Sequence, residues 1–197
     1  MKTAATVSAL AALCLAAAPA PTPLPTAPAT PPGYDKTFAL QGVTFRVKCP
    51  NTSSMNQLSI VPSGLTVDNS PITREVDGIV TGAEVADVNS DGSPEIYVYV
   101  KSAGSGSYGS LVAYSANKKK SLSSIYLPPV SENPKVSKGY MGHDAFAVVE
   151  NRFVQRFPVY KPGDNNASPT GGTRQLHYKL VPGEAGWVLK LDKVEEF

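Results

Sequence analysis

Two strand-like runs flank a glycine-rich loop in the stretch "EIYVYVKSAGSGSYGSLVAY", Glu95 to Tyr114. The first run, residues 95–101, alternates aliphatic and aromatic side chains with the two-residue period of a β-strand. Residues 110–114 read as a second strand. Because no segment of ten or more residues in the chain has clear helical periodicity, this pair of strands indicates an all-β fold.

The same alternation recurs along the rest of the chain. It is clearest at residues 43–48, 176–180 and 187–192, and shorter runs lie at 58–61, 84–88, 124–127, 145–149 and 153–160. Gly, Pro, Asn and Asp separate these runs, as expected of turns. About nine to ten short strands with turns between them predict an antiparallel β-sandwich or barrel.

The N-terminal region has a different composition. Lys2 precedes a small, apolar segment at residues 4–18, which is too short to span a bilayer but fits the core of a signal peptide. Proline, alanine and threonine then dominate, as in an extended linker. We therefore expect a signal peptide at 1–20, a disordered linker at 21–33 and one domain at 34–197, exported to the periplasm or secreted, without stable membrane insertion.

Charge and cysteine content limit the partners. The chain of 197 residues has a formal net charge of +2, which predicts no nucleic-acid partner, and its one basic run, residues 118–120, reads as a solvated turn.

Cys14 lies in the leader, so Cys49 is the only cysteine of the mature chain. Cys49 is either a buried free thiol or one half of a disulfide between two chains, which would make the protein a homodimer.

The loop between the two central strands matches a nucleotide-binding pattern. Gly104-Ser105-Gly106-Ser107-Tyr108-Gly109 spells G-x-G-x-x-G. A dinucleotide site needs a helix after the loop and an acidic residue about twenty positions further on. A strand follows instead, the acid is missing, and the lysine strand and catalytic motifs of kinases are missing too. The sequence therefore predicts neither a nucleotide site nor any other cofactor.

An acidic segment precedes the first central strand. Asp87-Val88-Asn89-Ser90-Asp91-Gly92 matches the first six positions of a calcium loop, and Glu95 stands at the ninth, but Val98 occupies the twelfth, where a bidentate Glu is required. The same residues have the chemistry of a hairpin turn. We interpret the segment as a plain turn; the alternative is a calcium-binding surface or adhesion module that uses Asp87, Asn89, Asp91 and Glu95.

Catalytic patterns are sparse. The chain has two histidines, and only His143-Asp144 resembles part of a hydrolase site, which gives a third hypothesis of a secreted hydrolase. We expect the protein not to be an enzyme.

The glycine-rich loop instead suits recognition. Its side chains that can form hydrogen bonds are those of Ser105, Ser107 and Tyr108. A tyrosine on a loop between two strands suits an interface anchor.

The run "DVNSDGSPEIYVYVKSAGSGSYGSLVAYSANKKKSLSSIYLPP", residues 87–129, closely resembles the periplasmic inhibitors of i-type lysozyme. This resemblance implies a β-sandwich and an i-type lysozyme as the partner. It also implies that Ser105-Gly106-Ser107-Tyr108, between Gly104 and Gly109, enters the lysozyme cleft. Because so short a loop falls below the size of a standard interface, we expect a second contact at residues 139–144, through Tyr140, His143 and Asp144.

Overall fold

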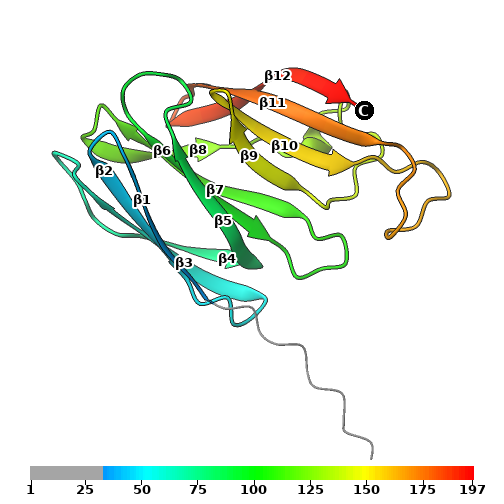
Figure 1. Cartoon of the computed structure of the whole chain (residues 1–197), viewed down its shortest axis with the longest axis horizontal. Helices are drawn as coiled ribbons and strands as arrows, with labels where there is room; N and C mark the ends of the chain where they lie inside the picture. Colours follow the sequence, from blue (N-terminus) through cyan, green and yellow to red (C-terminus); the bar gives the residue numbers. More distant parts are fainter. Residues whose placement is uncertain (1–32) are drawn as a thin grey trace, which may run out of the picture.

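The computed structural model describes residues 33–197 (Figure 1), so the predicted signal peptide and all of the predicted linker except Gly33 lie outside the described residues. The described chain forms twelve strands and one short 3₁₀-helix. They are β1 (Tyr34–Leu40), β2 (Val43–Cys49), β3 (Met55–Ser63), β4 (Ile72–Asp77), β5 (Ile79–Ala86), β6 (Glu95–Lys101), β7 (Gly109–Asn117), β8 (Ser121–Tyr126), η1 (Val130–Glu132), β9 (Ala145–Val149), β10 (Arg152–Pro158), β11 (Thr173–Pro182) and β12 (Trp187–Glu196).

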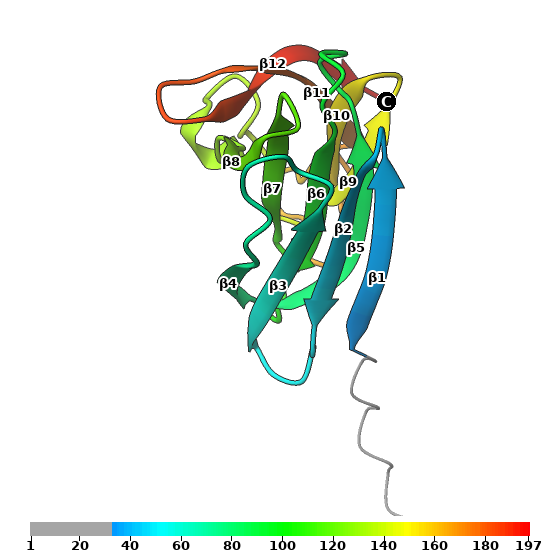
Figure 2. The same cartoon turned by 90° about the vertical axis from the view of Figure 1, so that its left-hand side faces the viewer.

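The strands form two sheets. Four strands pair in the order β1-β2-β3-β4, and Figure 2, viewed onto this sheet, shows them side by side. The other eight pair in the order β5-β6-β7-β8-β12-β11-β10-β9. In Figure 1 the green strands β5, β6 and β7 lie between the blue and cyan strands of the small sheet and the orange and red strands β11 and β12.

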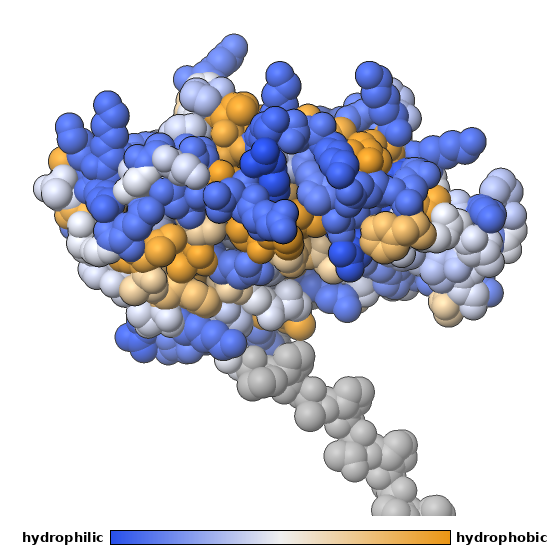
Figure 3. Space-filling model, turned by 45° about the horizontal axis from the view of Figure 1, so that its top comes forward, coloured by the Kyte–Doolittle hydropathy of each residue, from blue (hydrophilic) through white to orange (hydrophobic). Residues whose placement is uncertain are grey.

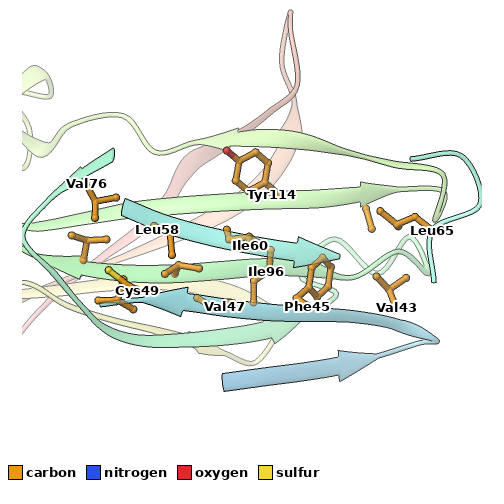
Figure 4. Close-up of a cluster of buried hydrophobic side chains, with 14 residues drawn as sticks. Val43, Phe45, Val47, Cys49, Leu58, Ile60, Leu65, Val76, Ile96 and Tyr114 are labelled. Carbon is orange, nitrogen blue, oxygen red and sulfur yellow. The ribbon is translucent and has the colours of Figure 1, made fainter. Parts of the chain in front are cut away.

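Strand β6 is buried on both faces. Its aliphatic residues Ile96, Val98 and Val100 join the core between the two sheets, which β2 and β3 complete from the opposite side (Figure 4). Tyr97 and Tyr99 point the other way, into a second core inside the large sheet, where Tyr97 stacks on Phe153. The alternation of aliphatic and aromatic residues therefore separates two cores, not a core from solvent.

The large sheet curls around the second core until its two edges meet. Strands β5 and β9 are the ends of the sheet order, yet the Val148 amide in β9 donates to Glu84 Oε2 in β5 at 3.1 Å. A side chain that accepts a hydrogen bond from an edge amide makes that amide less available for pairing with another strand. The molecule is thus a sandwich in which one of the two layers is close to a barrel.

The predicted all-β sandwich is confirmed, and each predicted run overlaps one of ten strands, although the runs at 84–88, 124–127 and 153–160 extend one or two residues beyond the strand ends. The count was too low, because β1 and β4 were missed. Both are edge strands with largely exposed side chains, so they lack a strong alternation. One pair departs from the antiparallel prediction, since Trp187 and Val188 of β12 pair parallel with β8. Cys49 is a free thiol buried in the core between the sheets.

The outer face of β11 and β12 is polar. Hydrophilic side chains cover most of the face that comes forward in Figure 3. Ion pairs cross between strands there, with Asp192 bonded to both Arg152 and Lys179. Exposed pairs of this kind contribute little to stability, so the fold depends on the two cores.

A carboxyl group is buried where β6 begins. Glu95 is 0% exposed, accepts the Val88 amide at 2.8 Å and accepts the Ser115 hydroxyl at 3.1 Å. Burial raises the pKa of Glu95 from 4.5 to about 7, against the effect of these hydrogen bonds, and the negative charges of Asp87 and Asp91 add to the rise. A proton therefore stays on the folded protein at a pH where the unfolded chain has lost it.

We predict that the free energy of unfolding falls by about 3 kcal/mol as the pH rises from about 4.5 to about 7, because each pKa unit corresponds to about 1.4 kcal/mol. Above the folded-state pKa the loss is complete. In Glu95→Gln this slope should disappear, since the amide is neutral at every pH; its oxygen can accept the Val88 amide while its nitrogen donates to the Ser115 hydroxyl. Urea denaturation of wild type and Glu95→Gln across this pH window measures how the free energy of unfolding of each changes with pH. Equal slopes for the two proteins would contradict the prediction.

Candidate functional site

The residues between β6 and β7 form a closed loop that displays two hydroxyl groups. We call residues 102–108 the Ser-Tyr loop. Its ends are joined by a hydrogen bond from Ser102 N to Tyr108 O at 2.9 Å, and its tip by one from Ser107 N to Gly104 O at 2.9 Å. The side chain of Ser105 is exposed, and that of Tyr108 is 48% exposed. The loop therefore has internal backbone order and outward-facing side chains.

Glycines allow a second loop, residues 139–144, to lie directly against the Ser-Tyr loop. A Cβ on Gly142, which has φ +85°, would lie 2.3 Å from Gly106 O, and one on Gly109 would lie 2.6 Å from the Asp144 Cβ. Both distances are shorter than the contacts that real Cβ atoms make. The His143 amide donates to Gly106 O at 2.8 Å across this junction. The glycines are thus needed for close approach of two backbones.

The carboxylate of Asp144 collects three hydrogen bonds from three parts of the chain. It accepts the Gly109 amide at 2.8 Å, the Tyr140 hydroxyl at 2.8 Å and the Gln155 amide group at 2.7 Å. Charged acceptors make stronger hydrogen bonds than neutral ones. Asp144 therefore fixes the point where the Ser-Tyr loop joins β7.

Two connections link this junction to the core. Gln155 of β10 accepts the hydroxyl of Tyr178 in β11 at 3.0 Å. The ring of Tyr108 packs edge-on against Tyr140, with centroids 5.7 Å apart, and Tyr140 packs edge-on against Phe157 at 4.6 Å. Burial raises the pKa of the Tyr140 hydroxyl, and the charge of Asp144 adds to this, so Tyr140 remains a hydrogen-bond donor.

A third segment, residues 161–172, supports the tip of the loop. The side-chain amide of Asn166 donates to Ser105 O at 2.6 Å, and its oxygen lies 3.2 Å from His143 Nε2. The Tyr160 hydroxyl donates to Asn166 O at 3.0 Å, which fixes that segment in turn. The Ser-Tyr loop is therefore held by backbone or side-chain contacts on several sides, while the Ser105 and Tyr108 side chains stay exposed.

The structure brings the two predicted groups of site residues together. Tyr140, His143 and Asp144 lie against the Ser-Tyr loop, and their polar groups bond to that loop or to neighbouring residues. Within residues 33–197, no hydrogen bond joins His143 to Asp144 or to a serine hydroxyl, so the arrangement required for the hydrolase hypothesis is not formed there. Gln155, Asn166 and Tyr178 were missed, because nothing in their local sequence points to a contact so distant in the chain.

The acidic segment forms a turn whose oxygens bond to the backbone. Asp87 accepts the amides of Asp91 and Gly92 at 3.0 and 2.9 Å, and Asp91 accepts the amide of Ser93 at 2.8 Å. Carboxylate oxygens of Asp87, Asp91 and Glu95 lie within 4.8 Å of one another, so these three could hold a cation, and the side-chain amide of Asn89 donates to Asp91. The interpretation as a turn accounts for these hydrogen bonds without an ion.

We predict that loss of the Asp144 carboxylate frees the base of the Ser-Tyr loop. In Asp144→Ala, the Gly109 amide should exchange its hydrogen about 10- to 100-fold faster, because it loses a charged acceptor contributing about 1.5–3 kcal/mol. Amide exchange followed by NMR measures this. Asp68→Ala is the matched control, since it removes a carboxylate that accepts the Ser70 amide in another loop. Unchanged exchange at Gly109 would contradict the assignment.

A chelator should leave the melting temperature of the domain unchanged, and added calcium should not raise it. The reason is that the turn is already stabilised by its own hydrogen bonds, whereas a bound ion would shift the equilibrium toward the folded state. Thermal unfolding with EDTA and with calcium checks this. Calcium binding in a calorimeter that vanishes in Asp87→Ala would overturn the interpretation as a turn.

The comparisons with known proteins point to one family. Residues 69–133 match the family model described as "Periplasmic lysozyme inhibitor of I-type lysozyme". No curated protein matches the chain. The family is one of inhibitor proteins and not of enzymes, which implies a protein partner. In residues 33–197, no helix is long and apolar enough to cross a membrane. The matched segment contains the whole Ser-Tyr loop, and over that segment the resemblance to the periplasmic inhibitors of i-type lysozyme is confirmed.

Proposed function

We propose that this protein inhibits an i-type lysozyme by inserting the tip of the Ser-Tyr loop, Ser105 to Tyr108, into the active-site cleft of the enzyme. The single observation that carries the proposal is the contrast within this loop. Its backbone is bonded on several sides, yet the side chains of Ser105 and Tyr108 are exposed. Such a loop loses little conformational entropy on binding, which leaves more of the contact energy for affinity.

The chemistry of the tip fits a glycosidase cleft. Enzymes that hydrolyse glycosidic bonds place two carboxyl groups around the bond, one protonated and one ionised. A hydroxyl group can donate to a carboxylate and accept from a carboxylic acid. Ser105 and Tyr108 would satisfy these groups without offering a glycosidic bond, so the enzyme would be blocked.

The sequence predicted a second contact with the enzyme through Tyr140, His143 and Asp144. In this proposal these residues have a different role. Their polar groups point to the Ser-Tyr loop and its neighbours. We assign them the role of shaping the loop, with Asn166, so that the inhibitor presents one conformation. The calcium module remains the alternative function, with the convergence of Asp87, Asp91 and Glu95 as its support.

Export belongs to the same proposal. The matched family is periplasmic, and residues 1–20 have the composition of a signal peptide. Residues 21–33 would then act as a linker to the domain at 34–197. An inhibitor in this compartment would meet lysozyme before the enzyme reaches the cell wall.

We predict that Tyr108→Ala weakens binding to an i-type lysozyme by about 30- to 1000-fold, because truncation of a central interface anchor costs about 2–4 kcal/mol. Ser105→Ala should cost less, about 1–3 kcal/mol, by leaving a buried acceptor without a partner. The two losses need not add, since both groups belong to one network. Surface binding and a cell-wall lysis assay measure these effects.

Two controls accompany this measurement. Tyr108→Phe keeps the ring against Tyr140 and separates the contribution of the hydroxyl. Val67→Ala truncates a side chain that is 73% exposed outside the loop and should bind like wild type. Full-strength binding by a folded double variant, Tyr108→Ala with Ser105→Ala, would exclude the loop as the inhibitory element.

A further inference from the structure

A groove of about 430 Å³ runs beside the Ser-Tyr loop. Its lining includes Tyr108 and Ser110, around the point where the loop joins β7, and also Tyr126, Pro129 and Ser131, from the end of β8 and the segment around η1. All five are exposed, and Tyr126 is 53% exposed. The ring of Tyr108 therefore belongs both to the loop and to the wall of the groove.

The lining of the groove is uncharged. None of its thirteen residues is Asp, Glu, Lys or Arg, although these make up 17% of the chain, so a random set of this size would hold about two. Three of the thirteen are tyrosines. Depletion of charge and enrichment of tyrosine are the composition of the central part of a protein interface.

The Ser-Tyr loop is too small to be a whole interface. A stable complex of standard size buries about 800 Å² on each partner and uses about 20–30 residues a side. The loop has only seven residues, and its exposed hydroxyl-bearing side chains are those of Ser105 and Tyr108. A partner that takes up the loop must therefore contact a larger adjoining area, and the groove adjoins the loop through Tyr108 itself.

We infer that the groove receives the wall of the lysozyme cleft, an uncharged segment of the same enzyme molecule that accepts the Ser-Tyr loop. This inference rests on the proposed function. A cleft that closes around Tyr108 brings one of its walls over the groove, between Tyr108 and Tyr126. That wall must be uncharged, because a charge desolvated there would meet no opposite charge in the lining.

The test inserts a charge into the groove at Ser131, a lining residue outside the Ser-Tyr loop. Ser131→Arg should weaken binding to the i-type lysozyme about tenfold or more, chiefly through faster dissociation, and leave the melting temperature unchanged. Ser63→Arg is the matched control. Ser63 is exposed at the end of β3. The nearby Thr66 amide donates to Lys119 O in the turn that follows β7, and the Ser-Tyr loop precedes β7 at the opposite end of that strand. Its binding should equal that of wild type.

A second variant removes bulk without adding charge. Tyr126→Ala should also weaken binding about tenfold, while Tyr126→Phe retains most of it, because the ring supplies the contact. Wild-type binding by folded Ser131→Arg and Tyr126→Ala would overturn the groove inference. If Tyr108→Ala still weakened binding as predicted, the proposed function would stand. Failure of the unaltered chain to bind the lysozyme would overturn both.

Discussion

The burial of both faces of β6 is the constraint on which the rest of the structure depends. Each residue from Glu95 to Val100 is buried. The aliphatic face needs the four-stranded sheet to cover it, and the tyrosine face needs the large sheet to curl back over it. Because both faces are fixed, the end of β6 cannot shift without disturbing two cores. The Ser-Tyr loop therefore starts from one of the best-anchored points in the molecule.

In the Ser-Tyr loop, the groups that hold the loop in place are largely separate from the groups to which the proposed function assigns binding. Internal contacts use mainly its backbone, at Ser102, Ser105 O, Gly106 O and the Tyr108 carbonyl. The hydroxyl groups of Ser105 and Tyr108 make none of these contacts. A change at Ser105 should therefore have little effect on the shape of the loop, whereas the ring of Tyr108 also packs against Tyr140.

Sequence patterns predicted the strands with strong periodicity and failed for strands that bury few side chains. Alternation identified ten strands, because their buried positions repeat at every second residue. It missed β1 and β4, whose edge positions bury few side chains. The exposed tetrapeptide was found from composition and resemblance, whereas its support by Gln155 and Asn166 depends on tertiary contacts that no local pattern encodes. Glu95, a candidate ligand by spacing, is also a buried carboxyl group of the core.

The Ser-Tyr loop and the residues that support it come from different parts of the chain. The family match ends at residue 133, but Gly142, Asp144, Gln155 and Asn166, which hold the loop, all lie beyond it. A linear peptide that copies the Ser-Tyr loop would hold the hydroxyl groups but would have to lose its own chain entropy on binding. A useful mimic would need a cyclic scaffold that reproduces the ties at Ser105 O, Gly106 O and Gly109 N. Transfer of the tetrapeptide to another protein faces the same requirement.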